Sequence, residues 1–183
     1  MLLHWIVLAL FTQAATSGTP VEMEFVPESP TFDAAATIYT DIWRKDGARM
    51  VEVMEKVSGI RFADRRVRAI VLEGVSYSGF GDRPMRLRAS YPDEVKRATL
   101  VHELGHRLLN GVRTRDEIDE HRKLFLVLYD MWIALYGQEF ADRMVQVERG
   151  RKGLYDYDSA WTWALALSAE QRAARYAGLR DRR

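Results

Sequence analysis

Three residues within five positions, His102, Glu103 and His106, combine the side chains that metal-dependent hydrolysis requires. In a helix, residues four apart lie one turn apart on the same face, so the imidazoles of His102 and His106 can reach one metal ion. Glu103 lies just off this face, where its carboxylate can accept a proton from a water on the metal and pass it to a leaving amine. The H-E-x-x-H spacing therefore predicts a site for a zinc ion (Zn²⁺), with Glu103 as the catalytic base.

A catalytic zinc usually has three protein ligands, so a third must come from elsewhere in the chain. His121 is a candidate because it falls on an apolar stripe of the next predicted helix, and a buried imidazole there needs a partner that zinc would provide. Glu120 is the rival, because a glutamate on the following helix is the other common solution. We predict His102, His106 and His121 as ligands, with Glu120 as the alternative to His121. The stripe consists of Ile118, His121, Phe125, Leu128, Trp132 and Leu135.

The composition is that of an ordinary globular domain. The 183 residues are 48% hydrophobic and 29% charged, and this length favours one domain with its own core. The 27 Lys and Arg residues nearly balance 26 Asp and Glu, so the net charge of +1 creates no global field that would attract nucleic acid or an anionic membrane. The absence of cysteine excludes disulfides, thiolate metal sites and cysteine nucleophiles. Any metal must be held by His, Asp or Glu.

The N-terminal residues have the pattern of a secretory signal peptide. Residues 2–11 are an apolar run too short to span a bilayer comfortably, and the small residues that follow suit cleavage after Ala14 or Ser17. We predict a signal peptide over 1–18, which implies a secreted or periplasmic protein; without it, the protein would be cytoplasmic. No other stable membrane span is expected. Residues 19–32 contain prolines that predict an extended arm, and residues 33–183 form the predicted domain.

The domain is predicted to be mostly helical with a small sheet, an α+β fold. Val67–Glu73 is rich in β-branched residues and Met85–Ser90 alternates apolar with polar residues, so both are predicted strands. The segment 74–84 between them contains glycines and is expected to be a hairpin loop or a flap. A predicted helix over Asp93–Leu109 carries the H-E-x-x-H residues. Further helices are predicted over 33–57, 114–136 with Thr114 and Glu117 as a capping box, 138–148, 159–167 and 169–179.

The residues from His102 to His106 resemble the active-site helix of the zincin metallopeptidases. This resemblance implies a short sheet beside the helix and an extended peptide or protein substrate bound along the edge strand of that sheet. In zincin geometry, Met85–Ser90 would be this edge strand. Segment Asp119–Phe125 resembles the third-ligand region of SprT-like proteases, whereas the apolar helix that begins at Glu120 is similar to minimal gluzincins, in which glutamate is the third ligand.

The sequence thus predicts a zinc metallopeptidase, and two other functions stay open. One is a non-catalytic zinc-binding or interaction protein that retains the H-E-x-x-H helix for folding. The other is an SprT-like protease acting on DNA-bound proteins, although the chain lacks a cysteine-rich zinc ribbon and nucleic acid is not an expected partner. The oligomeric state is not indicated by the sequence.

Two supporting roles can be anticipated around the metal. Asp130 could hold a ligand imidazole in one tautomer. A hydrogen-bond donor is also needed to stabilise the oxyanion of the transition state. The candidate donors are Tyr77, Tyr129, Tyr155 and Tyr157.

Overall fold

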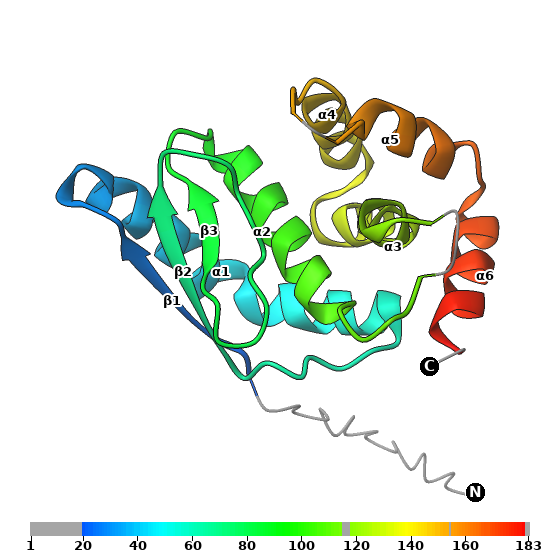
Figure 1. The fold of residues 1–183 in the computed structure, drawn as a ribbon, viewed down its shortest axis with the longest axis horizontal. Helices are drawn as coiled ribbons and strands as arrows, with labels where there is room; N and C mark the ends of the chain where they lie inside the picture. Colours follow the sequence, from blue (N-terminus) through cyan, green and yellow to red (C-terminus); the bar gives the residue numbers. More distant parts are fainter. Residues whose placement is uncertain (1–19, 115–117, 154, 182–183) are drawn as a thin grey trace, which may run out of the picture.

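A small sheet lies beside a larger group of helices in the computed structural model (Figure 1). The structure describes residues 20–114, 118–153 and 155–181, so the signal peptide predicted over 1–18 lies outside the described residues. The predicted fold class, a mostly helical α+β fold, is confirmed. In chain order the elements are β1 (Glu22–Pro27), the 3-10 helix η1 (Pro30–Phe32), α1 (Asp33–Ser58), β2 (Arg66–Leu72), β3 (Met85–Arg88), α2 (Asp93–Leu108), α3 (Glu120–Tyr136), α4 (Gln138–Arg149), α5 (Tyr157–Leu165) and α6 (Ala169–Arg180).

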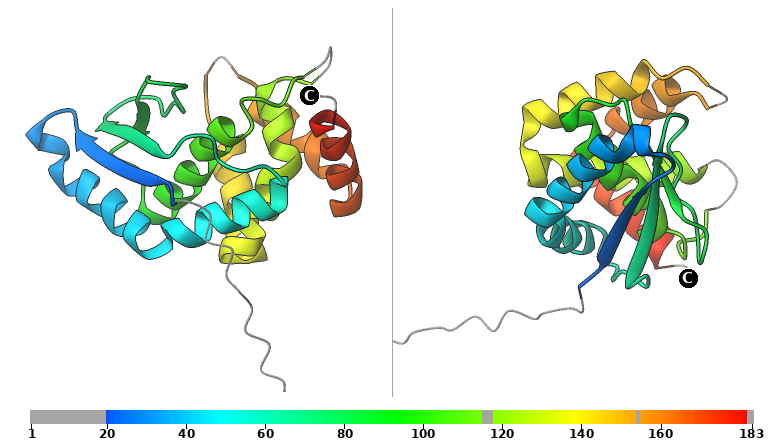
Figure 2. Two further views of the ribbon diagram at one scale, coloured as in Figure 1. Left: turned by 90° about the horizontal axis from the view of Figure 1, so that it is seen from below. Right: turned by 90° about the vertical axis from the view of Figure 1, so that its left-hand side faces the viewer.

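The three strands form a parallel sheet in the order β1, β2, β3, and helices cover one of its faces. In β2, the buried residues Val67, Ala69 and Val71 alternate with the exposed residues Arg66 and Arg68. This alternation follows from the two-residue period of a strand and gives the sheet one apolar face. Figure 2 shows helices α1 and α2 lying against that single face.

The proline-containing segment predicted as an arm contributes the outer strand β1. Residues 22–27 pair in parallel with residues 66–71 of β2. The prolines stand where a strand tolerates a missing N–H, because Pro20 precedes β1, Pro27 is its last residue and Pro30 opens η1. The extended conformation expected for this segment is therefore part of the sheet.

The segment between β2 and β3 is not a hairpin, so the first of the two expectations for it is wrong. Parallel strands cannot be joined by a tight turn, and the chain must cross from the end of β2 back to the start of β3. On the way, Tyr77 forms an antiparallel bridge with Arg86, with backbone N···O distances of 2.9 and 2.7 Å. The loop therefore adds a short extended segment outside β3.

Helix α2 is surrounded by protein on nearly every side, which fixes the position of the residues it carries. Its residues from Leu100 to Leu108 are all buried. At Gly105, an added Cβ would lie 2.6 Å from a methyl group of Leu124, so the glycine lets α3 approach α2 closely. This contact sets the distance between the H-E-x-x-H residues and the start of α3. No helix among the described residues is both long and apolar enough to cross a membrane.

Candidate metal centre

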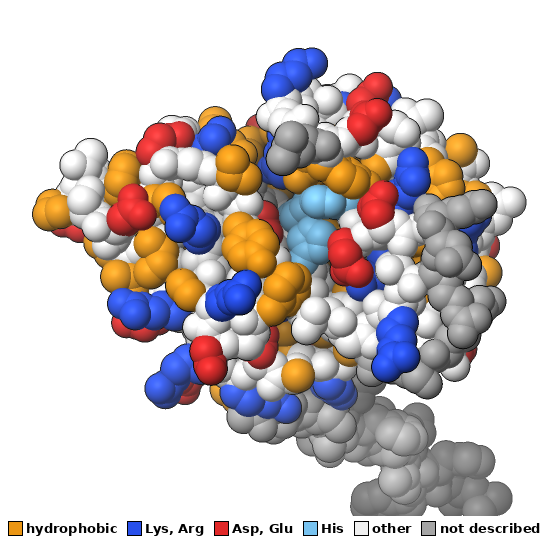
Figure 3. All heavy atoms as spheres, in the orientation of Figure 1, with side chains coloured by type: hydrophobic (Ala, Val, Ile, Leu, Met, Phe, Trp, Pro, Cys, Tyr) orange, Lys and Arg blue, Asp and Glu red, His pale blue; other side chains and the backbone are white. Residues whose placement is uncertain are grey.

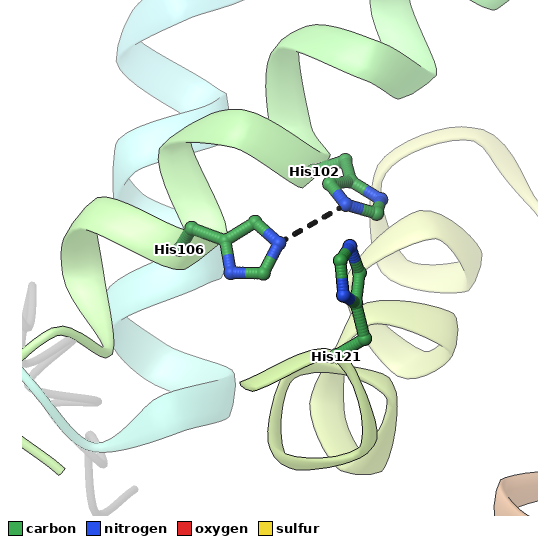
Figure 4. Close-up of side chains that lie close together, drawn as sticks. All are labelled: His102, His106 and His121. Atoms are coloured by element: carbon green, nitrogen blue, oxygen red, sulfur yellow. Dashed lines mark hydrogen bonds between the residues drawn. The ribbon is translucent and has the colours of Figure 1, made fainter. Parts of the chain in front are cut away.

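The structure brings the three predicted ligand residues together. His102 and His106 lie one turn apart on α2, and His121 reaches toward them from the first turn of α3 (Figure 4). One potential ligand atom from each imidazole lies within 4.8 Å of the other two. His102 and His106 are buried and His121 is partly buried. In Figure 3 the histidine surface lies in a hollow on this face of the molecule, with hydrophobic side chains on one border and acidic side chains on the other.

The spacing of the nitrogens of His102 and His106 would allow both to bind one metal ion. Nitrogens bound tetrahedrally to zinc at about 2.0–2.1 Å are separated from one another by about 3.3 Å. The Nε2 atoms of His102 and His106 are 3.2 Å apart. Burial and the neighbouring histidines lower the pKa of His106 and lower that of His121 to about 4, so both imidazoles are neutral at pH 7. Neutral imidazole is the form that binds a metal.

Glu120, the alternative third ligand, lies outside this cluster. Its carboxylate pairs with the buried ammonium of Lys123 at 2.6 Å and is 55% exposed. Asp119 caps the helix by accepting a hydrogen bond from the backbone N–H of Arg122 at 2.8 Å. Helix α3 therefore begins at Glu120 and not after Thr114, so the predicted start of this helix is wrong; Glu117 lies outside the described residues.

Glu148 on α4 supports His102, a role that was not predicted from the sequence. Its buried carboxylate lies 2.7 Å from Nδ1 of His102 and accepts a hydrogen bond from the indole N–H of Trp161 at 2.9 Å. Burial alone would raise the pKa of Glu148, but the charges of His102 and Arg151 and these hydrogen bonds lower it to about 2. An ionised carboxylate on Nδ1 holds the proton there, which leaves Nε2 of His102 free to bind a metal.

A signal for Glu148 was present in the sequence. On α4 the buried residues Ala141, Met144 and Val145 are followed at the same helical spacing by Glu148. A carboxylate that continues an apolar stripe must find a partner in the interior. Asp130, the residue predicted to support a ligand imidazole, instead pairs with Arg172 at 2.7 Å.

Glu103 is buried beside the histidines, with only 5% of its surface exposed. Burial raises its pKa to about 7, against the opposing effect of the charges of His102 and Arg151. A group with a pKa near the working pH can both accept and release a proton, which is the property required of a catalytic base.

Of the four tyrosines predicted as candidate donors, Tyr157 has a hydroxyl that is hydrogen-bonded to a histidine of the cluster. Its hydroxyl is 3.1 Å from Nε2 of His121, and burial raises its pKa to about 12, so the phenol keeps its proton. Tyr155 stacks on the ring of His121 at 4.1 Å between centroids, and its hydroxyl donates to Asp119. Tyr129 instead donates a hydrogen bond to Asp142, and Tyr77 lies on the loop outside β3.

Comparisons of the chain with protein-family models, with curated proteins and with solved structures give no match. The chemistry of the described residues is therefore the basis for inferring a function. That chemistry comprises three imidazoles that lie close together, a buried carboxylate of raised pKa and a phenol hydrogen-bonded to one of the imidazoles.

The strand β3 is an edge strand of the sheet, as expected, but the backbone groups on its outer edge are already paired and so are not available to a substrate. The backbone N–H and carbonyl of Arg86 both pair with Tyr77. The N–H of Arg88 donates to Oγ of Ser76 at 3.2 Å, and its carbonyl accepts a hydrogen bond from the hydroxyl of Tyr39 at 2.9 Å. A peptide that added to this sheet would have to pair with the loop segment outside β3.

Replacing Glu148 by glutamine should weaken zinc binding by about 10- to 100-fold, because the neutral amide no longer holds the proton on Nδ1 of His102. A chromophoric chelator competing for zinc would measure this change in Kd. Glu139→Gln is the matched control, since Glu139 is exposed on the same helix and should leave the Kd unchanged. Equal Kd values for the Glu148 variant and the wild type would show that Glu148 does not support a metal ligand.

Proposed function

We propose that this protein is a zinc-dependent peptidase in which His102, His106 and His121 hold the metal and Glu103 is the catalytic base. The convergence of the three imidazoles, within 4.8 Å of one another and beside a buried glutamate, is the observation that carries this proposal. Imidazole nitrogens suit several divalent metals, and zinc is the one that three histidines most often hold for hydrolysis.

The residues around the cluster have distinct tasks in the proposed reaction. When bound, zinc would lower the pKa of a water and polarise the carbonyl of the substrate. Glu103 takes a proton from the attacking water and gives it to the nitrogen of the breaking peptide bond. Tyr157 donates a hydrogen bond to the carbonyl oxygen as that oxygen gains negative charge. Glu148 keeps the ring of His102 in the orientation and tautomer that metal binding needs.

Metal removal tests the proposal directly. The zinc-loaded protein should cleave members of a broad peptide library, because the bound metal supplies the activated water. Mass spectrometry of the library would detect the cleavage. Treatment with a chelator should abolish cleavage, and added zinc should restore it. A protein that binds zinc and is stabilised by it, but cleaves no peptide, would instead be the non-catalytic zinc-binding protein considered above.

A further inference from the structure

Arg107 is a buried arginine that follows the metal-binding His106 directly on α2. Only 2% of its side chain is exposed. Its Nε donates to the carboxylate of Asp64 at 2.7 Å. Its Nη1 donates to the backbone carbonyls of Ser78 at 3.0 Å and Arg83 at 3.4 Å. Its Nη2 donates to the backbone carbonyl of Gly81 at 3.1 Å. The guanidinium thus joins the metal-binding helix to the loop between β2 and β3.

The loop is shaped to surround this guanidinium. Gly79 and Gly81 both have positive φ, 59° and 58°, a conformation that glycine adopts at no steric cost. A Cβ on Gly79 would lie 2.4 Å from the carbonyl oxygen of Arg83, so this turn excludes any larger residue. The backbone carbonyl oxygens of Ser78, Gly81 and Arg83 consequently all accept hydrogen bonds from the guanidinium of Arg107.

The part of the loop that Arg107 holds is the outermost extended segment of the sheet. Residues 75–78, which we call the rim segment, pair through Tyr77 with β3 and end at Ser78, whose carbonyl accepts from Arg107. Val75 and Tyr77 are 79% and 44% exposed, and they are two of the three large hydrophobic residues that are exposed in the described part of the chain. Figure 3 shows hydrophobic side chains beside the histidine surface.

Stability alone does not explain a buried arginine at this position. Burying a guanidinium costs free energy, and an apolar residue of similar volume often stabilises a fold as well or better. A guanidinium offers five donors in a fixed plane, which can fix several carbonyl oxygens at defined positions. The side chain at 107 therefore sets the position of the rim segment relative to His106.

We propose that Arg107 is a positioning residue for substrate: it holds the rim segment at a fixed distance from the histidine cluster, so that an extended peptide with apolar side chains binds along Val75 and Tyr77 and reaches the metal. This proposal rests on the metal centre of the proposed function. The main-chain groups of Tyr77 pair with Arg86 and the carbonyl of Ser78 accepts from Arg107, so the exposed apolar side chains of Val75 and Tyr77 supply the contacts that select the peptide.

Two hydroxamates distinguish binding along the rim segment from binding to the metal. Acetohydroxamate reaches only the metal, whereas a hydroxamate of a tripeptide of leucines also extends along the rim segment. Zinc-loaded wild type should bind the tripeptide compound more tightly than acetohydroxamate. Arg107→Lys, which cannot reach the carbonyls and Asp64 together, should weaken the tripeptide compound by about tenfold and change the affinity for acetohydroxamate less than about twofold. Amide hydrogen exchange over residues 75–83 should be faster in this variant.

Equal weakening of both hydroxamates, or weakening of neither, would overturn the proposal, as would a wild type that does not prefer the tripeptide compound. If the wild type cleaves no peptide but Arg107→Lys still weakens only the tripeptide compound, the peptidase function fails and the role of Arg107 stands.

Two further variants keep the test informative. Gly79→Ala displaces the rim segment from the loop side, leaves Arg107 intact, and should reproduce the selective loss even if Arg107→Lys does not fold. Arg172→Lys is the matched control. Arg172 is also buried and binds the carboxylate of Asp130 and the backbone carbonyl of Leu167, but it lies on α6. This control should leave the ratio of the two affinities unchanged.

Discussion

Glu103→Gln is expected to lower kcat for peptide hydrolysis by about 10²- to 10⁴-fold, the contribution typical of a catalytic acid or base. The glutamine amide has nearly the shape of the carboxylate but cannot accept a proton from water. It does not alter the three imidazoles, so the zinc content per chain should equal that of the wild type. Steady-state kinetics on a peptide found in the library screen, together with elemental analysis, would measure both quantities.

Glu94→Gln is the matched control for this variant. Glu94 lies on the same helix but is exposed and pairs with Arg143 at 3.3 Å, so kcat should stay within about twofold of the wild type. Unchanged hydrolysis in Glu103→Gln would remove Glu103 from the mechanism. Loss of zinc from the same variant would give the glutamate a structural role at the metal centre in place of a catalytic one.

His121→Ala is expected to raise the Kd for zinc by more than about 100-fold, beyond the upper end of what the loss of a supporting residue costs. Removing His121 leaves two imidazoles on one helix, and two ligands hold zinc poorly because the ion then depends on water for half of its coordination. Elemental analysis after dialysis should find about one zinc per chain in the wild type and almost none in this variant.

Glu120→Ala should be compared with His121→Ala, because Glu120 is adjacent to His121 and is the alternative candidate for the third metal ligand. The carboxylate of Glu120 pairs with Lys123 and is more than half exposed, so its loss should leave the zinc content unchanged. Zinc retained by His121→Ala but lost from Glu120→Ala would reverse the assignment and make the glutamate the third ligand.

Features that depend on the geometry of a single helix were predictable from the sequence. The four-residue spacing of His102 and His106 places both on one face of α2, and the apolar stripe of α3 turns His121 inward; the structure has this arrangement. Their role as metal ligands is still a prediction. The helical character of most of the chain after residue 92 was predictable for the same reason.

Features that depend on contacts between distant segments were not predictable in this way. Glu148 meets His102 across 46 residues, and only the packing of α4 against α2 brings them together. The strand character of β3 was apparent, but whether its outer edge is free depends on the path of the loop through Tyr77. The contacts of Arg107 were not predictable either, because the carbonyls that it binds come from a loop 24 to 29 positions earlier.

X-ray absorption spectroscopy at the zinc edge tests the central claim, a metal held by three histidines with a position left for chemistry. The protein purified with zinc should contain one ion per chain, and the spectrum should show three imidazoles and at least one oxygen ligand at about 2.0–2.1 Å. A protein that binds no zinc under these conditions, or a spectrum with two imidazoles or fewer, would contradict the three-histidine centre.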